Sequence, residues 1–399
     1  MKRFFLTTLS LLIALTTTTG CSEKELTDRD VLMLIYKNNN GEKWTEFAKK
    51  NWGSELPLKD WNGVKTNENE RVIELTVGND SITGIFPEEI GLLTELKSLT
   101  LRTGRAPCKE QPFPASISNL TNLESLSLSG NMADKMELQV PPVGKLVKLK
   151  KLYYGGTNKA PQGFDNLTEL VEVEFMGLLG DIPAILSKMT NLEKINIRGS
   201  SFTGKIPSDI GNLKKLKSLF IDKSQFVGSV EGLSGTFPES IWELENLDYI
   251  FLRRVCTGGT LSPKIGNLKK LTSITIIECG LTGEIPKELY TLEKLRSLSI
   301  YQNQLTGIIA PEIGNLLALT DISVHNNNLT GTLPATLGNL TKLKSIQVQK
   351  NQLTGTIPAE LAKCPLDGVF VDFTGNQFSK DIVPALKAHV RFDKWKFDK

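Results

Sequence analysis

The residues best suited to catalysis lie close together near the C-terminal end of the chain. Asp321, Ser323 and His325 alternate along the sequence, and His389 is the other histidine of the chain. On a strand, the three alternating residues would point to one face and lie roughly 7 Å apart, which separates Asp321 from His325 by roughly 13 Å. A Ser-His-Asp triad needs a histidine bonded to both partners at once. The spacing therefore argues against a triad.

A second pair of chemically active residues is Glu172 and Glu174. Two carboxylates on one face of a strand have a separation that an inverting glycosidase tolerates. We expect them on a shallow surface without a second wall, where Lys194 and Arg198 of the following strand can neutralise them. The sequence therefore predicts a protein that is not an enzyme.

Composition excludes several other classes of protein. The chain has 399 residues, of which 40% are hydrophobic and 23% charged, so it is neither disordered nor an integral membrane protein. The formal net charge of +3 is too small to indicate nucleic-acid binding. No phosphate-binding loop or metal signature is present, and we expect no cofactor and no metal.

The sequence repeats itself with a period near 24 residues. Its clearest unit, LTDISVHNNNLTGTLPATLGNL, begins at Leu319, between similar units that begin at Leu295 and Leu343. In the same frame, units begin from Val72 onward, and a degenerate thirteenth begins near Gly368. Alternating apolar residues predict a short strand with one buried face, which stacked neighbours must cover. The asparagine at the end of the strand, as at Asn303, Asn327, Asn351 and Asn376, has an amide that can satisfy backbone groups at the bend.

This unit resembles the plant-type leucine-rich repeat, LxxLxLxxNxLTGxIPxxLGxL, over about 300 residues. The resemblance implies an α/β fold, a right-handed solenoid. Its parallel sheet would form the concave face, short helical or 3-10 turns the convex side, and caps both ends. We therefore expect an N-terminal cap at residues 26–70, about 13 repeats at 71–384 and a C-terminal cap at 385–399. The stretch around Trp44, Trp52 and Trp61 resembles the N-terminal cap of such repeats in bacterial surface proteins.

The N-terminus has the pattern of an export signal. A basic start, Met1-Lys2-Arg3, precedes an apolar run that is too short to span a membrane. The run ends Thr18-Thr19-Gly20-Cys21, which resembles a bacterial lipoprotein box with Thr18 in place of the usual leucine. We favour a signal peptide at residues 1–20, lipidation (palmitate) on Cys21 and a tether at 21–25. The alternative is an ordinary signal with an incidental cysteine. The residue after Cys21 is Ser22, and the resemblance then favours the outer membrane, with the protein on the cell surface.

The remaining cysteines allow two interpretations. Cys256 and Cys279 fall at nearly the same place in adjacent repeats, so a disulfide between them is geometrically feasible. Cys279 also fits the strand-end position of the repeat, and we favour buried free thiols. Cys364 replaces the closing leucine of its repeat, and Cys108 lies in an insertion.

One group of large side chains falls on the solvent-facing positions of the predicted sheet. Aromatic residues and arginines at such positions are typical of binding hot spots. The predicted ligand-binding residues are Phe220, Tyr249, Phe251, Arg253, Arg254, Tyr301 and His325, with Arg198, Asp222 and Glu278 nearby. The alternative is that the aromatic rings only pack on one another across strands. An insertion at residues 224–234 would form a lip beside them. We expect that removing Phe251 and Arg253 together barely changes the melting temperature.

These patterns favour a lipid-anchored, non-catalytic recognition protein. Its partner would be a protein of a host or neighbouring-cell surface, bound on the concave face. The alternative is a polysaccharide-binding accessory lipoprotein or adhesin that captures a glycan on the same residues. We expect no nucleic-acid partner, and the membrane would be reached through the lipid on Cys21.

The lipoprotein interpretation predicts that Cys21→Ser leaves the protein folded but unanchored. The lipid attaches the chain to the membrane, whereas the caps and repeats that follow supply the folded core. Membrane fractionation together with circular dichroism checks both parts. Unchanged retention of the variant in the membrane fraction would contradict lipidation at Cys21.

Overall fold

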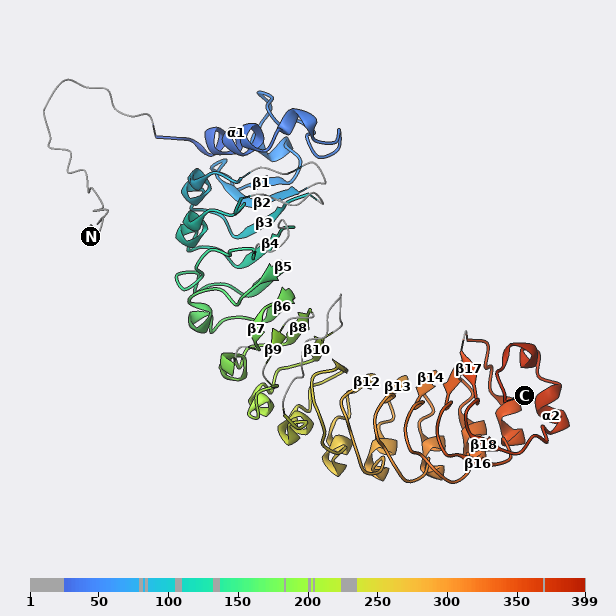
Figure 1. Ribbon diagram of the computed structural model, residues 1–399. Helices are drawn as coiled ribbons and strands as arrows, with labels where there is room; N and C mark the ends of the chain where they lie inside the picture. The colour runs from blue at the N-terminus through green and yellow to red at the C-terminus, as the bar shows by residue number, and fades with distance from the viewer. Residues whose placement is uncertain are drawn as a thin grey trace, which may run out of the picture.

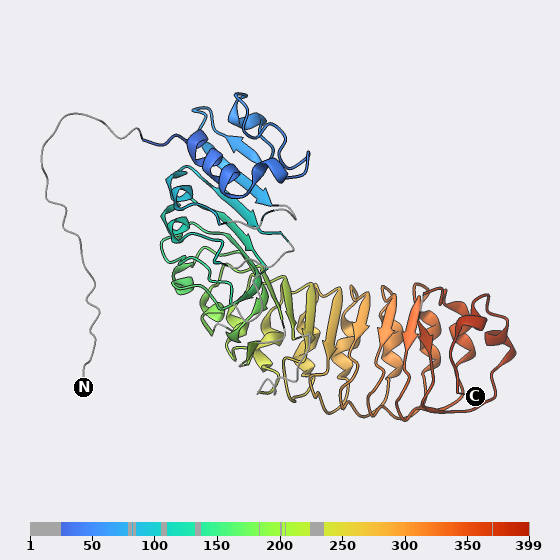
Figure 2. The ribbon, with the colours of Figure 1, turned by 45° about the horizontal axis from the view of Figure 1, so that its top comes forward.

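The computed structural model describes residues 25–78, 82, 85–104, 110–131, 137–182, 184–199, 202–203, 205–223, 235–368 and 370–398. The expected signal peptide, Cys21, Cys108 and the insertion at 224–234 lie outside the described residues. Figures 1 and 2 show one elongated array of coils that turns sharply near its middle, with the sheet on the inner side of the turn and the short helices on the outer side.

A single sheet of fourteen strands runs through the described part of the array. In spatial order its strands are β1 (Val64–Thr66), β2 (Val72–Gly78), β3 (Ser98–Arg102), β4 (Ser125–Ser129), β5 (Lys151–Asn158), β6 (Glu172–Leu178), β8 (Lys194–Arg198), β10 (Ser218–Asp222), β11 (Tyr249–Arg253), β12 (Ser273–Ile277), β13 (Ser297–Ser299), β14 (Asp321–Ser323), β15 (Ser345–Gln347) and β17 (Val371–Asp372). The strand β1 pairs antiparallel with β2, and every later pair in this sheet is parallel. Two smaller pairs join β7 (Gly180–Asp181) to β9 (Phe202–Thr203) and β16 (Thr354–Gly355) to β18 (Gln377–Phe378).

Short 3-10 helices form the opposite side of the coils. They span Glu88–Leu92, Ala115–Asn119, Phe164–Asn166, Ala184–Lys188, Ile210–Asn212, Glu239–Glu243, Pro263–Asn267, Lys287–Thr291, Pro311–Asn315, Ala335–Asn339 and Ala359–Lys363. Several begin directly after the proline of the repeat, as at Pro286 and Pro334, which have extended backbone. Proline lacks an N–H and cannot continue ladder pairing, so it ends the extended segment where the helix begins. The fold is therefore the leucine-rich-repeat solenoid that the period indicated.

Each coil buries its leucines and isoleucines between the two sides. In the coil that begins at Leu295, the side chains that point inward are at most 3% exposed: Leu295, Leu298, Ile300, Leu305, Ile309, Ile313 and Leu316. The same positions of the neighbouring coils cover them above and below. A coil cannot exclude water from this interior alone, so stability comes from stacking.

In the four repeats nearest the C-terminus, an asparagine after the strand joins consecutive coils. Asn327 is 8% exposed; its amide donates to the carbonyl oxygens of Ile300 at 2.8 Å and Val324 at 3.0 Å, and it accepts from the N–H of Leu305 at 3.1 Å. Asn303, Asn351 and Asn376 make the corresponding bonds in their coils. The predicted role of these amides at the bend is confirmed.

Glycine is required where the chain turns away from the sheet. Gly331 and Gly355 both have a φ of 75°, and a Cβ on either would approach a side-chain methyl of the preceding coil to 2.8 Å. A left-handed backbone and this close approach both exclude larger residues. The Leu-Thr-Gly turn of the repeat therefore follows from backbone geometry.

The first and last coils are covered by aromatic clusters. The helix α1 (Asp28–Asn38) begins with a capping box between Thr27 and Asp30, and the buried rings of Tyr36, Trp44, Trp52 and Trp61 contact one another in series. The N-terminal segment also contains the 3-10 helices Gly41–Lys43 and Leu58–Asp60. At the other end, α2 (Pro384–Lys387) and the 3-10 helix Phe392–Lys394 are followed by Trp395 and Phe397, which pack on Phe373.

The hydrogen bonds of Asn327 predict that its replacement lowers stability much more than replacement of its neighbour, Asn328. Replacing Asn327 with alanine should cost about 2 kcal/mol or more, because three buried backbone groups lose their partner. The matched control is Asn328→Ala, whose exposed side chain makes one 3.5 Å contact with Gln352 and should cost under about 0.5 kcal/mol. Denaturant unfolding of both variants measures the difference. Equal stability of the two variants would contradict the role assigned to Asn327.

Candidate functional site

The concave face carries three parallel rows of side chains that cross the strands. Strand register places Thr76, Thr100, Ser127, Tyr153, Glu174, Asn196, Phe220, Phe251, Thr275, Ser299, Ser323 and Gln347 in the central row. Two residues earlier on each strand, a first row includes Tyr249 and Ser273. Two residues later, a third row includes Arg198, Asp222, Arg253 and Ile277. Backbone bonds from Ile300 to Ser323 and from Gln302 to His325 continue the ladder, so Tyr301 and His325 also lie in the third row.

Phe220, Tyr249 and Phe251 form an aromatic cluster on β10 and β11, near the turn of the array (Figure 1). The rings of Phe220 and Phe251 stack with centroids 4.3 Å apart and planes 7° apart, and the Tyr249 ring lies 6.5 Å from Phe220 at 4°. All three side chains are half-buried. Burial raises the pKa of Tyr249, so this phenol stays neutral at physiological pH. The cluster is a large, uncharged surface of the kind found at the centre of interfaces.

Arg198 covers the far side of the aromatic cluster. Its guanidinium carbon lies 4.3 Å above the Phe220 ring, and its Nε donates to Oδ1 of Asn196 at 3.0 Å. A guanidinium at this distance is attracted by the ring and leaves its outer N–H groups available to a ligand. The sequence placed Arg198 near the site but did not identify this contact.

Arg253 is not a free guanidinium. It donates to both carboxylate oxygens of Asp222, from Nε at 2.7 Å and from Nη2 at 2.8 Å. These hydrogen bonds raise the pKa of Arg253, and Asp222 itself is only 7% exposed. This ion pair argues against the expectation that removing Phe251 and Arg253 together barely changes the melting temperature, because the loss of Arg253 would leave a buried carboxylate unpaired.

Arg254 lies apart from the aromatic cluster. It occupies the turn after β11 with a φ of 55°, in the same repeat position as Glu278, whose φ is 52°. The Nε of Arg254 donates to Oε2 of Glu278 at 2.6 Å. Arg254 therefore belongs to an ion pair at the rim of the sheet, and the structure does not bring it to the rings.

Tyr301 and His325 form a second stack, just beyond the ends of β13 and β14 and separated from the aromatic cluster by β12. Their ring centroids are 4.2 Å apart, and the planes differ by 21°. Burial lowers the pKa of His325 and raises that of Tyr301, so both rings are neutral near pH 7. His325 Nδ1 lies 2.6 Å from the side-chain amide of Asn326.

The arrangement around His325 does not form a triad. Asp321 accepts a hydrogen bond from the hydroxyl of Thr320 at 2.6 Å, and Ser323 is 6% exposed. Both are separated from His325 along the strand direction, as the spacing predicted. Among the described residues, no group of three or more His, Cys, Asp or Glu side chains is placed to hold a metal ion. Cys256, Cys279 and Cys364 are buried free thiols.

Sequence reasoning missed Tyr153, which lines a cavity on the N-terminal half of the same face. The cavity has a volume of about 160 Å³ and is lined by Ser125, Leu126, Ser127, Lys151, Leu152, Tyr153, Glu172, Val173, Glu174 and Lys194. Lys151 lies 3.5 Å from Glu172. A tyrosine in the central row was the signal that could have identified this cavity.

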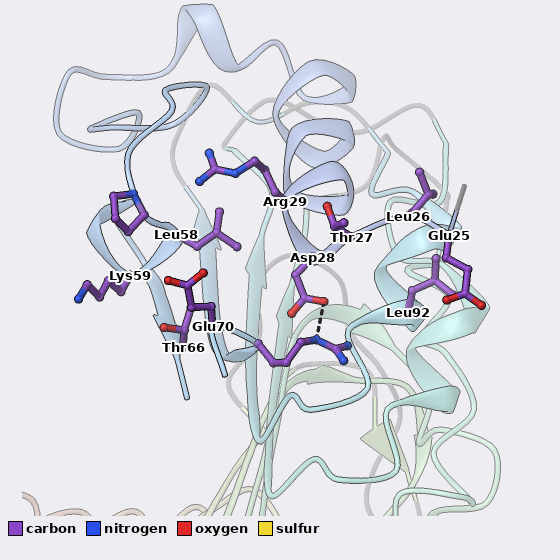
Figure 3. Close-up of a pocket in the computed structure, with 12 residues that line it drawn as sticks. Glu25, Leu26, Thr27, Asp28, Arg29, Leu58, Lys59, Thr66, Glu70 and Leu92 are labelled. Atoms are coloured by element: carbon purple, nitrogen blue, oxygen red, sulfur yellow. Dashed lines mark hydrogen bonds and ion pairs between the residues drawn. The ribbon is translucent and has the colours of Figure 1, made fainter. Parts of the chain in front are cut away.

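A larger cleft of about 800 Å³ lies between the N-terminal segment and the first coils (Figure 3). Its polar residues hold the segment in place. Asp28 accepts from Nε of Arg71 at 3.0 Å and from the N–H of Val72 at 2.7 Å, while Arg29 donates to the carbonyl oxygens of Ser54 and Leu56. We therefore assign this cleft to the junction between the cap and the repeats, and the candidate site remains the concave face.

Comparison with known proteins agrees with this fold. The Leucine Rich Repeat family model matches residues 191–213, 294–316 and 318–340. Phytosulfokine receptor 1 of Arabidopsis thaliana is 39% identical over 83 residues, which are 20% of this chain and 8% of that receptor. The crystal structure of PEPR1-AtPEP1 aligns over 93% of this chain and 54% of that chain, with a TM-score of 0.68 and 24% identity. The crystal structure of a TDR receptor aligns over 80% and 58%, with a TM-score of 0.65 and 29% identity.

These similarities support the fold. The chain contains leucine-rich repeats, and its coils are arranged as in the solved leucine-rich-repeat solenoids that it resembles. It spans about half the length of the two solved chains and a small part of phytosulfokine receptor 1. In the described part of the chain, no helix has the length and apolar character needed to cross a membrane.

The ion pair between Arg253 and Asp222 predicts that one substitution lowers stability and that a second substitution restores most of it. Arg253→Ala should lower the free energy of unfolding by about 1–3 kcal/mol, because the Asp222 carboxylate stays buried without its cation. Adding Asp222→Ala should recover most of that loss, since no charge then remains unpaired. Denaturant unfolding of the single and double variants measures this. The assignment is wrong if Arg253→Ala is as stable as the wild type.

Proposed function

We propose that this protein is a non-catalytic recognition protein that binds a protein ligand on its concave face. The observation that carries the proposal is the aromatic cluster with its guanidinium cover. It places stacked, uncharged rings and an arginine on a surface that nothing in the described chain covers completely. Interfaces are anchored by aromatic residues and arginine in this way. The relatives are themselves named as receptors, which supports binding to a protein or peptide.

Attachment to a membrane is a separate part of the proposal. The box before Cys21 supports a lipid anchor on that residue, with the protein at the outer membrane and the solenoid on the cell surface. The partner would then be a protein of a host or neighbouring cell. Protease treatment of whole cells tests the orientation, because a surface protein is cleaved without cell lysis, whereas a periplasmic one is protected.

Glycan capture is the second candidate function. The cavity beside Tyr153 favours it, since hydroxyl groups, lysines and carboxylates together offer both donors and acceptors to a sugar. A glycan array and an array of surface proteins distinguish the two candidates. Under our proposal, binding to the protein array depends on Phe251.

The test compares Phe251 with a phenylalanine outside the concave face. Phe251→Ala should weaken binding to a partner found on the protein array by about 2 kcal/mol or more, roughly 30-fold, because it removes one of the two closely stacked rings of the aromatic cluster. The control is Phe47→Ala in the N-terminal segment, whose side chain is 78% exposed and far from the concave cluster; it should leave affinity unchanged. Titration with both variants measures the effect. Equal affinity of Phe251→Ala and wild type would place the ligand elsewhere.

A further inference from the structure

Planar side-chain groups follow one another across the concave face, one per strand. The guanidinium of Arg198 on β8 lies 4.3 Å from the Phe220 ring on β10, which stacks at 4.3 Å on Phe251 of β11. Tyr301, two residues beyond the end of β13, stacks at 4.2 Å on His325, two residues beyond the end of β14. These separations are close to the spacing between strands, about 4.8 Å. Both stacks therefore run along the direction in which the strands succeed one another.

The strand β12 interrupts this series. It presents Ser273, Thr275 and Ile277 to the concave face, and Thr275 is the register partner of Phe251. Ile277 lies between Arg253 and Tyr301 and is only 3% exposed, so the third row is already filled there. Phe220 has a planar group on each face, whereas Phe251 has one on a single face. Its other face is next to threonine, which is too small to cover a ring.

The interruption has room for one planar group. β11 and β13 are two strand spacings apart, about 9.6 Å, and each stacked neighbour needs about half of that distance. Tyr301 is displaced from Phe251 by two residues along the strand direction, about 6.6 Å. A two-ring group such as indole would overlap Phe251 and reach Tyr301, whereas a single ring would contact mainly Phe251.

The charges around Thr275 select an uncharged group. Of the acidic residues around Thr275, Asp222 and Glu278 already accept from Arg253 and Arg254. Asp321, two strands away in the first row, accepts from the hydroxyl of Thr320. The neighbouring side chains in the first and central rows are Ser273, Ser297 and Ser299, which offer hydroxyls to a polar ring edge. Among the described residues of β11 and β12, no side chain carries an unpaired charge on the concave face, and the guanidinium of Arg198 lies three strands from Thr275, over the Phe220 ring.

We propose that the protein ligand inserts an aromatic side chain, tryptophan best of all, over Thr275 and against the open face of Phe251. This inference rests on the proposed function and identifies the group of the ligand that the concave face recognises. The inserted ring completes a continuous series of planar groups from Arg198 to His325. Stacking on Phe251 supplies affinity, and the small side chains of Ser273 and Thr275 on β12 leave space for the ring.

The experiment fills the proposed ligand position over β12 with a side chain of the protein itself. Thr275→Trp places an indole over β12, and Thr100→Trp is the matched control in the central row of β3, between Thr76 and Ser127. A phage-displayed library of random peptides is selected on the full-length wild-type protein, and the selected peptides are titrated against each variant. We expect these peptides to share an aromatic residue whose replacement by alanine weakens binding roughly 30-fold.

Under this proposal Thr275→Trp loses binding by a similar factor, while Thr100→Trp binds like wild type. Thr275→Trp should also melt no lower than wild type, because its indole stacks on Phe251 in the way the ligand ring does. Thr275→Phe, with a smaller ring, provides the same block if the indole disturbs the fold.

Other results overturn the inference and separate it from the proposed function. If Phe251→Ala no longer binds the peptides but Thr275→Trp binds them as tightly as wild type, the concave face binds protein, and the proposal that a ligand ring inserts over Thr275 is wrong. If Phe251→Ala binds the selected peptides as tightly as wild type, the proposed function fails as well. If no peptide is selected while Thr275→Trp blocks oligosaccharides on a glycan array, the occupant is a sugar ring.

Discussion

A coil of this protein cannot bury its own apolar side chains, and this constraint governs the whole structure. The leucines of one coil are covered only when the next coil lies against it, and the buried asparagines satisfy the backbone groups that stacking would otherwise leave unpaired. Stacking fixes the distance between strands and the register of side chains along the concave face. The ends of the stack then need separate covers, which are the tryptophan cluster at one end and the Phe373 cluster at the other.

The same spacing determines what the concave face can bind. Rings on adjacent strands are held at stacking distance without any special local structure, as at Phe220 and Phe251. The ion pair between Arg253 and Asp222 neutralises the charges beside those rings. The result is an aromatic surface near the turn of the array, covered on one side by the guanidinium of Arg198 and supported by strands whose inner faces are buried. A rigid surface of this kind loses little conformational entropy when it binds a partner.

The fold could be predicted from the sequence because the same residue types recur at the same positions of many repeats, and each type meets one structural requirement of the coil. Leucine positions, the strand-end asparagine and the Leu-Thr-Gly turn each have one structural reason, and the structure confirms the solenoid that they indicate. The site was less predictable, because contacts across strands depend on rotamers and on which residue ends each strand. The sequence placed Arg254 with the rings, but it lies in the turn beside Glu278. It also treated Arg253 as available, although Asp222 already binds it. Tyr153 and its cavity were missed because that half of the face is otherwise lined by small hydroxyl residues.

The central claim is that a protein partner contacts the concave face at the aromatic cluster in the cell. The most direct measurement is photo-crosslinking with benzoyl-phenylalanine incorporated at Thr275, compared with the same group at Thr100, in intact cells together with the host or neighbouring cells. The account predicts a covalent adduct with a protein from position 275 and none from position 100, and the Phe251→Ala substitution should remove that adduct. Adducts of equal yield from both positions, or an adduct at position 275 that persists with Phe251→Ala, would contradict it.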